Sequence, residues 1–338
     1  MRHILLPPSL QESVRNSRLL DVPFYLAMEE WIARSLNPAS DYFFMWQVEP
    51  SVIFGRNQLI DKEVDLDYCR RHGIATFRRK SGGGCVYADR NNLMLSLITG
   101  SHDDVSTVFQ RYTQRIAALL RSFDLNAEAT SRNDITIDGL KVSGNAFYRL
   151  PGRSIAHGTM LFDSDFVHIL HAITPSRSKL MSKGVQSVES RITTLHSYLP
   201  DLTVSRFCQK AVAMLCNEPE ARLSEADVVE IEALAVKYRE EAWIRGNHLR
   251  NSLTRSRRFE GVGEFCADIL MARDQTISCV DLSGDFLFTA PVQPLTEAIV
   301  GARLEPDSLR RALQEVEPSD IVPGLTKEMF IELLLTNQ

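Results

Sequence analysis

Residues 78–87 read RRKSGGGCVY, and this stretch decides how the first half of the chain is interpreted. Three consecutive glycines let the backbone approach a ligand closely and point several N–H groups at an anion. The adjacent arginines add guanidinium groups, which pair with phosphate or carboxylate in a bidentate way. The stretch is neither a Walker loop nor a dinucleotide fingerprint. It predicts a site for a carboxylic acid or its adenylate, although a tight turn with solvated arginines explains it equally well.

Short strands and a helix are expected on the N-terminal side of this loop. Ala75–Phe77 predicts a strand that leads into the glycines, and Tyr42–Trp46 and Ser51–Phe54 are expected to form neighbouring strands. Further upstream, Asp21 and Pro23 are typical of a helix start, and apolar residues then recur at helical spacing. That spacing predicts a helix with one buried stripe.

On the C-terminal side of the loop, the pattern predicts a second amphipathic helix between Val105 and Phe123. Asp134–Ile137 and Lys141–Val142 are then separated by Asp138-Gly139, a pair that favours a tight β-hairpin turn. A further helical stripe runs from Val228 to Tyr238. Helices and strands mix without a strict strand–helix–strand repeat, which indicates an α+β fold.

The length of 338 residues and the 44% hydrophobic content predict two domains. The segment from Gly246 to Arg258 is polar and basic, so we expect the boundary there, with a larger domain over 1–246 and a smaller one over 252–338. Phe259–Ala272 and Thr276–Phe288 are expected to form paired strands of the smaller domain. Helices are expected after them at Leu295–Val300, Ser308–Val316 and Lys327–Leu335.

Composition excludes several classes of protein. The net charge of -5 and the pI near 5.9 argue against a nucleic-acid binder, which needs basic residues to neutralise phosphates. No apolar run approaches the length of a membrane span, and Pro7 and Pro8 interrupt the first residues before a signal-like region develops. The six cysteines lack zinc-site spacing, which indicates free thiols in a reducing compartment, and only Cys85 lies in a suggestive place. We expect a soluble intracellular protein.

Two further motifs carry candidate chemistry. Asn133-Asp134 precedes the segment DGLKVSGNA at 138–146, where Lys141 has no carboxylate on its own strand face. Such a lysine can stabilise negative charge that develops on a carbonyl or phosphate oxygen, although alone it resembles an ordinary surface lysine. The sequence HGTML at 157–161 places His157 before a glycine at the start of an apolar strand, and an isolated instance usually marks a turn.

Taken in order, these motifs resemble the lipoate-protein ligase family over nearly the whole chain. In that family an arginine pair precedes S-G-G-G-x-V-Y, and N-D, G-x-K-x-S-G-x-A and H-G-T-x-L follow it, as they do here. The resemblance continues through Pro175, Lys179-Leu180, Ser182–Val185 and Ser187–Arg191. It implies the fold shared with biotin-protein ligases and class II aminoacyl-tRNA synthetases: a mixed, largely antiparallel sheet with flanking helices, plus a small α+β C-terminal accessory domain.

The resemblance also implies a reaction in two steps. Lipoate or octanoate attacks the α-phosphate of ATP to give an acyl adenylate and pyrophosphate, and a carrier lysine then takes the acyl group. Lys141 would be the catalytic residue, and Asp134 would help hold Mg²⁺ against the phosphates. The residues implied in binding the acyl adenylate are Arg79, Ser81, Gly82, Gly83, Gly84, Val86, Tyr87, Asn133, Asp134, Ser143, Gly144, His157 and Gly158. The strand around Leu93–Leu97 would form another wall.

The implied partners are apo lipoyl domains of 2-oxoacid dehydrogenase acyltransferase subunits or the glycine-cleavage H protein. No nucleic acid and no membrane are expected as partners. A cytoplasmic monomer is expected, because one chain carries all the motifs.

Two departures from the family pattern leave alternatives open. Ala88 and Asn91 stand where the family usually has histidine and glycine, so the retention of ATP activation is open. One alternative is a lipoyltransferase that uses preformed lipoyl-AMP or a carrier-bound lipoyl group. In octanoyltransferases a nucleophilic cysteine stands where this chain has Ser154, and serine is a poorer thioester-forming residue. Another alternative, of a different class, is a lipoate-binding protein without catalysis.

Overall fold

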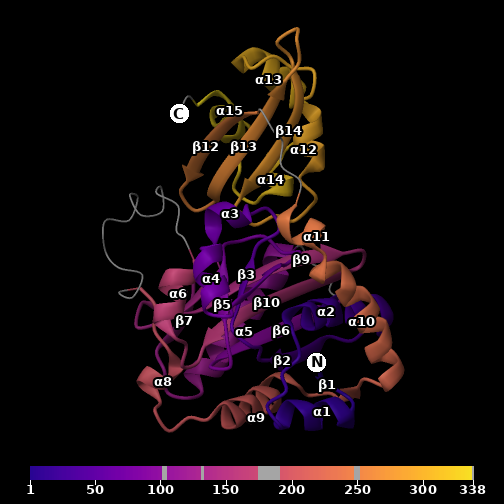
Figure 1. Ribbon diagram of the computed structural model, residues 1–338, viewed down its shortest axis with the longest axis vertical. Coiled ribbons are helices and arrows are strands. Elements are labelled where there is room, and N and C mark those ends of the chain that lie inside the picture. The colour runs from indigo at the N-terminus through magenta and orange to yellow at the C-terminus, as the bar shows by residue number, and fades with distance from the viewer. Residues whose placement is uncertain (101–104, 131–132, 174–190, 247–251, 337–338) are drawn as a thin grey trace.

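A computed structural model describes the chain except for residues 101–104, 131–132, 174–190, 247–251 and 337–338. Figure 1 shows a larger part that holds the N-terminus and, above it, a smaller part built from the C-terminal residues. The strands are β1 Arg2–Leu5, β2 Tyr42–Trp46, β3 Ser51–Phe54, β4 Ala75–Arg78, β5 Val86–Ala88, β6 Asn92–Thr99, β7 Ala127–Ala129, β8 Asp134–Ile137, β9 Leu140–Leu150, β10 Arg153–Leu161, β11 Ala221–Arg222, β12 Leu253–Phe259, β13 Gly263–Met271 and β14 Ile277–Gly284.

The helices vary from single turns to α5 with 17 residues. They are α1 Pro8–Arg15, α2 Val22–Ser35, α3 Ile60–Glu63, α4 Leu66–Arg71, α5 Val105–Arg121, α6 Phe166–Ala172, α8 Leu195–Tyr198, α9 Val204–Leu215, α10 Glu225–Arg239, α11 Glu241–Arg245, α12 Gln293–Ala298, α13 Pro306–Ala312, α14 Pro318–Ile321 and α15 Lys327–Leu335. Within the described residues, no helix combines the length and apolar character needed to cross a lipid bilayer.

An eight-stranded sheet in the order β11-β1-β2-β6-β10-β9-β8-β7 forms the centre of the larger part. β1 pairs in parallel with β2 and β11, and the other neighbours pair antiparallel. One apolar cluster packs α5 and α9 against the sheet, and a second packs α2 and α10 against it. The expected mixed, largely antiparallel sheet with flanking helices is therefore confirmed.

Helix α2 begins as expected, because the Asp21 side chain accepts a hydrogen bond from the Phe24 N–H. The expected single buried stripe is wrong, however, since every residue from Val22 to Ala33 is buried. Helix α10 covers the side of α2 that faces away from the sheet, as Figure 1 shows, and both helices contribute to one apolar cluster. Glu29 and Glu30 are buried with the apolar residues and require partners.

The pairing expected for β2 and β3 is wrong. β2 lies between β1 and β6 in the large sheet, whereas β3 pairs with β4 and β5 in a separate three-stranded sheet. Pro50 and its neighbours carry the chain from one sheet to the other. β4 leads directly into the glycine stretch, as expected, so this small sheet positions the loop.

The expected hairpin is present as β8 and β9, which pair antiparallel. Asp138 and Gly139 have φ of 50° and 81°, the positive values that a two-residue hairpin turn of this kind requires. The turn places Lys141 near the beginning of β9 and residues 143–146 further along the same strand.

The smaller part contains the sheet β12-β13-β14 and its own apolar cluster, to which α12, α13 and α15 contribute. The three expected helices are present: α15 has the expected bounds, and α12 and α13 begin and end earlier than expected. The polar segment expected to be the domain boundary contains a strand, β12, so that expectation is wrong for residues 253–258. The single strand expected over Phe259–Ala272 is also wrong, because a turn near Gly261 separates β12 from β13. β12 is an edge strand, and edge strands tolerate charged side chains such as its partly buried arginines, which hid the strand pattern.

The smaller part rests on the glycine loop of the larger part. The Gly83 N–H donates to the Phe286 carbonyl at 3.1 Å, and the Gly284 N–H donates to the Asn57 carbonyl at 2.7 Å. A Cβ atom added at Gly82 would lie 2.4 Å from the Phe286 oxygen, so only glycine permits this approach. The two parts therefore meet at the loop that the sequence identifies as a binding element.

Candidate active site

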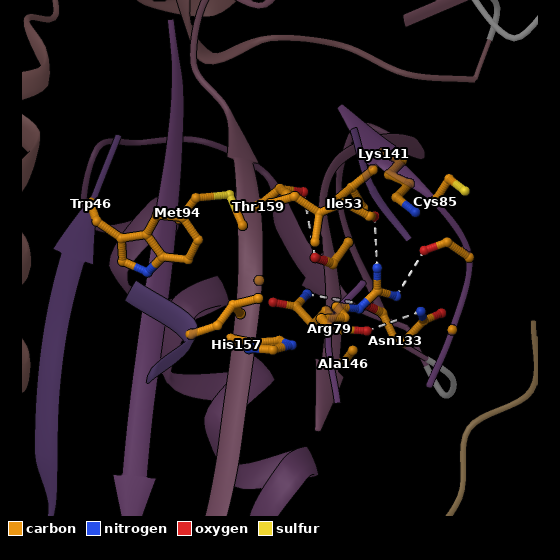
Figure 2. A pocket seen from close by; sticks show the side chains of 17 residues that line it. Trp46, Ile53, Arg79, Cys85, Met94, Asn133, Lys141, Ala146, His157 and Thr159 are labelled. Atoms are coloured by element: carbon orange, nitrogen blue, oxygen red, sulfur yellow. Dashed lines mark hydrogen bonds between the residues drawn. The ribbon is translucent and has the colours of Figure 1, made fainter. Parts of the chain in front are cut away.

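A cavity lies between the large sheet and the glycine loop, and Figure 2 shows its two ends. Trp46 and Met94 lie at one end, and Lys141 and Cys85 lie at the other. The lining residues are Leu26, Trp46, Ile53, Arg79, Gly83, Gly84, Cys85, Val86, Met94, Asn133, Lys141, Gly144, Asn145, Ala146, His157, Gly158 and Thr159. One end is thus apolar and the other carries hydrogen-bonding groups and a cation, which suits a molecule with an apolar tail and an acidic head.

Arg79 organises the glycine loop. Its guanidinium donates to the carbonyl oxygens of Gly82 and Gly84 at 2.7 Å each and to that of Ile53 at 2.8 Å. Its Nε donates to Ser81 Oγ at 2.9 Å. These four bonds use four of the five N–H donors of the guanidinium, and one N–H of Nη1 is left. Pairing of Arg79 with phosphate or carboxylate stays a prediction.

The Arg79 side chain is 5% exposed and has no carboxylate among these partners. Burial lowers its pKa to about 10, so the guanidinium stays protonated at neutral pH. A buried positive charge beside the cavity attracts an anion electrostatically. Arg79 therefore holds the loop in shape and contributes positive charge to the cavity.

Ser81, His157 and Glu29 form a buried chain behind the cavity. Ser81 Oγ lies 2.7 Å from His157 Nε2, and His157 Nδ1 lies 3.0 Å from the Glu29 carboxylate. Glu29 also accepts a hydrogen bond from Ser96 at 2.6 Å, and Ser96 accepts one from Trp46 at 2.9 Å. Both ring nitrogens of His157 are therefore engaged, and the chain fixes its ring at the cavity wall.

Lys141 stands at the polar end of the cavity. Its Nζ lies 2.7 Å from Asp134 Oδ1, and the side chain is 37% exposed. Asp134 lies on β8, the strand paired with β9, so the carboxylate that sequence inspection did not find on the lysine's own strand comes from its neighbour. This pair keeps the ammonium group directed at the cavity while leaving it accessible to a ligand.

Asn133 and Asn145 bond to each other across the hairpin. Asn133 Nδ2 donates to the Asn145 carbonyl at 3.1 Å, and Asn145 Nδ2 donates to the Asn133 carbonyl at 3.0 Å. Both residues line the cavity beside Lys141. Gly158 faces Asn145 from β10, and a Cβ atom added there would lie 1.9 Å from Asn145 Oδ1.

The substitution Gly158→Ala is expected to destabilise the protein by about 1–3 kcal/mol, because overpacking at this contact displaces Asn145 and breaks its pairing with Asn133. Denaturant unfolding measures the effect. Gly84→Ala is the matched control, since a Cβ there has open space around it. Equal stability of both variants would contradict the packing described.

The structure divides the expected binding residues into two groups. Those that line the cavity are Arg79, Gly83, Gly84, Val86, Asn133, Lys141, Gly144, His157 and Gly158. Ser81, Gly82, Tyr87, Asp134 and Ser143 lie outside the lining. Ser81 contacts the lining residue His157, and Asp134 contacts the lining residue Lys141. Gly82 lies against Phe286 of the smaller part.

Tyr87 belongs to a different apolar cluster. Successive side chains of a strand point to opposite faces, so Val86 lines the cavity and Tyr87 packs with Val52 and Phe54 on the other side. The same alternation applies to the expected wall at Leu93–Leu97: Met94 lines the cavity, whereas Leu93, Leu95 and Leu97 pack against α5 and α9.

Several lining residues were not expected from the sequence. They are Leu26, Trp46, Ile53, Cys85, Asn145, Ala146 and Thr159. Glu29, behind the lining, was also missed, although two adjacent acids inside the apolar run LAMEEWIA were a usable signal. His157 lies inside β10, which begins at Arg153, and so occupies neither a turn nor the start of the strand.

The departures from the family pattern lie away from the cavity lining. Ala88 is buried in the cluster of α2 and α10, and Asn91 follows β5 in a turn, where its N–H donates to Asp89. Ser154 is buried on β10 and does not line the cavity. The matching positions at Pro175, Lys179-Leu180, Ser182–Val185 and Ser187–Ser190 lie outside the described residues.

Among the described residues, no three His, Cys, Asp or Glu side chains gather as metal ligands. Mg²⁺ bound through a nucleotide needs only one or two carboxylates plus phosphate oxygens. Asp134, next to Lys141 and a third exposed, fits that smaller requirement.

Comparisons with known proteins agree along the chain. Residues 21–215 match the lipoyl protein ligase A/B catalytic domain, and residues 250–334 match the bacterial lipoate protein ligase C-terminus. The chain is 33% identical over 327 residues to lipoate-protein ligase 1 of Staphylococcus aureus, covering 95% of this chain and 99% of that protein.

Solved structures show the same fold. The crystal structure of P. falciparum LipL1 in complex with lipoate aligns with a TM-score of 0.75 at 16% identity, over 99% of this chain and 98% of that one. A lipoate-protein ligase A bound with ATP aligns with a TM-score of 0.60 at 23% identity, over 72% of this chain and 98% of that one.

Proposed function

Because the chain belongs to the lipoate-protein ligase family, we propose that it activates lipoate or octanoate with ATP and transfers the acyl group to a carrier lysine. One observation supports this most strongly. A single cavity joins an apolar end, at Trp46 and Met94, to a polar end at Lys141 and Asn133. Its two ends suit an apolar acyl chain and an acidic head group.

In the first step, an oxygen of the acyl carboxylate attacks the α-phosphorus of ATP. A new O–P bond forms, the bond to the β-phosphate bridging oxygen breaks, and pyrophosphate leaves with that electron pair. Lys141 Nζ supplies a fixed positive charge to the carboxylate and phosphate oxygens as negative charge develops on them. Its pairing with Asp134 supports this role, because the amine is held in place before substrates arrive.

Magnesium would neutralise charge on the nucleotide phosphates when bound. We propose Asp134 as the carboxylate that would hold it.

In the second step, the ε-amine of a carrier lysine attacks the carbonyl of the acyl adenylate. The C–N bond forms, the C–O bond to AMP breaks, and the amine loses its proton to solvent or to the departing AMP. We assign His157 an orienting role at the acyl group rather than the role of base. The contacts of both ring nitrogens with Ser81 and Glu29 support this assignment.

We propose a catalytic domain over residues 1–246 and an accessory domain over 252–338, which the separate apolar cluster of the smaller part supports. The carrier would be a lipoyl domain of a 2-oxoacid dehydrogenase acyltransferase subunit or the glycine-cleavage H protein. The six free cysteines support a reducing, cytoplasmic location.

The full chain is expected to catalyse lipoate-dependent exchange between ATP and pyrophosphate and then to transfer the lipoyl group to an apo lipoyl domain. Radiolabelled pyrophosphate exchange and a mass shift of the carrier measure the two steps. Transfer from synthetic lipoyl-AMP without ATP–pyrophosphate exchange would show that the protein is a lipoyltransferase that does not activate lipoate. Lipoate binding without either activity would leave a binding protein, and nothing in the comparisons favours these alternatives.

A further inference from the structure

A second hollow lies between the larger and the smaller part of the chain. We call it the interdomain groove. It has a volume of about 880 Å³ and shares no lining residue with the cavity of Lys141. Arg56, Arg149 and Lys237 line it from the larger part, and residues 280–283 and 288–293 line it from the smaller part. Arg78 and Lys80 also face the groove, whereas Arg79 between them faces the cavity.

Cations outnumber acids along the groove. Glu240 and Asp281 are its only lining acids in the described part of the chain. Lys80 pairs with Glu30, outside the groove, and Arg78 donates to the carbonyls of α11 residues Trp243, Ile244 and Arg245. These two side chains are therefore already satisfied.

The remaining three lining cations, Arg56, Arg149 and Lys237, have no carboxylate within ion-pair distance among the described residues. Two of them lie against the same ring: the Arg56 guanidinium is 5.6 Å from the centre of the Trp243 ring and Lys237 Nζ is 5.4 Å from it. Burial lowers the pKa of Arg56 from its ordinary value, and both burial and the Arg56 charge contribute to a pKa of about 10 for Arg78. In the described part of the structure, five lining cations thus face two lining acids, so the groove carries an excess of positive charge.

Two amide groups at the groove point to a missing acceptor. Gln58 is 1% exposed, and its Oε1 accepts from the Gly55 N–H at 2.8 Å and from the Cys85 thiol at 3.4 Å, whereas its Nε2 is buried without a partner. Asn57 Nδ2, from the next lining residue, is also buried without a partner. Buried amide donors are normally hydrogen-bonded, so a ligand with several acceptor oxygens would supply the missing hydrogen-bond partners of both side chains.

We propose that the interdomain groove binds the phosphate or diphosphate group of a small molecule, separately from the cavity of Lys141. A carboxylate offers one negative charge and two acceptor oxygens. The described lining of the groove presents three cations without a carboxylate partner and two amide donors without an acceptor, so it can bind a ligand with more charge and more oxygens. A phosphate group brings up to about two charges and three strong acceptor oxygens. Because both parts of the chain line the groove, a bound anion also stabilises the arrangement in which they meet.

Isothermal titration of the full chain with inorganic pyrophosphate, without nucleotide or magnesium, tests this site. We expect saturable binding that weakens at least tenfold in Arg149→Gln and in Lys237→Gln. Both side chains are exposed, so the substitutions leave the fold intact. Inorganic phosphate as a second titrant separates the two sources: equal affinity indicates a single phosphate, and tighter pyrophosphate binding indicates a diphosphate.

A control variant distinguishes the groove from other exposed arginines. Arg311→Gln removes an exposed arginine of α13 outside the groove and is expected to bind pyrophosphate like the unchanged protein. Absence of binding, binding by the groove variants equal to that of the unchanged protein, or an equal loss in Arg311→Gln would overturn the proposal. These results do not depend on whether the chain ligates lipoate.

Discussion

Replacement of Lys141 by alanine is expected to lower lipoate-dependent ATP–pyrophosphate exchange by at least about a hundredfold. The ammonium group is the cation at the polar end of the cavity, and its contact with Asp134 holds it before substrates bind. Its removal takes away charge stabilisation that increases as the adenylate forms. Partial exposure of the side chain means that folding does not depend on it, so the melting temperature should change little.

Lys327→Ala is the matched control for this experiment. Lys327 is similarly exposed at 30% and also faces a carboxylate, Glu317, but it lies on α15 of the smaller part. Exchange by this variant should equal that of the unchanged protein. If Lys141→Ala also kept its exchange rate, the lysine would have no part in activation, and the proposed mechanism would be wrong.

The second large effect is expected at Arg79. Glutamine there would leave the carbonyls of Ile53, Gly82 and Gly84 without their donors, which is expected to lower the free energy of unfolding by about 3–5 kcal/mol. The glycine loop would lose its brace and the cavity its buried charge, so lipoate affinity should fall at least about tenfold. Denaturant unfolding and lipoate titration at low temperature, where the variant stays folded, measure the two effects.

Arg153→Gln separates loop shape from general stability. Arg153 is 2% exposed and donates to five backbone carbonyls, one in the last turn of α2 and four after it, and it does not line the cavity. A similar loss of stability with unchanged lipoate affinity is expected. Were Arg153→Gln to weaken lipoate binding as much as Arg79→Gln, the loss of affinity would reflect stability alone.

Local patterns in the sequence predicted much of the fold. Apolar spacing predicted α2, α5 and α10, and the Asp138-Gly139 turn predicted the β8–β9 hairpin. The pairing of strands was harder to predict from the sequence, because it depends on contacts between residues far apart in the chain. β2 therefore joined the large sheet and β3 a different one. β12 was missed because an edge strand needs no regular apolar alternation.

The site was predicted in outline but not in its contacts. Motif order brought together the glycine loop, Lys141 and His157, and all of them meet at one cavity. The order of the motifs did not predict that Glu29 and Trp46 belong to the site, because their positions depend on how α2 and β2 pack. It also did not reveal that Arg79 braces the glycine loop, because bonds to the Gly82 and Gly84 carbonyls depend on how the loop folds back.

The contact between the glycine loop and the smaller part has an evolutionary consequence. One main-chain bond joins Gly83 of the loop to Phe286, and another joins Gly284 to Asn57, which follows β3 in the larger part. Main-chain bonds use no side-chain atoms, so residues of many types can form them. Relatives can therefore exchange side chains on either surface without correlated substitutions. Pairs of residues on the two sides of this junction should therefore show little covariation. In an alignment of relatives, the junction should be visible mainly as an invariant small residue at position 82.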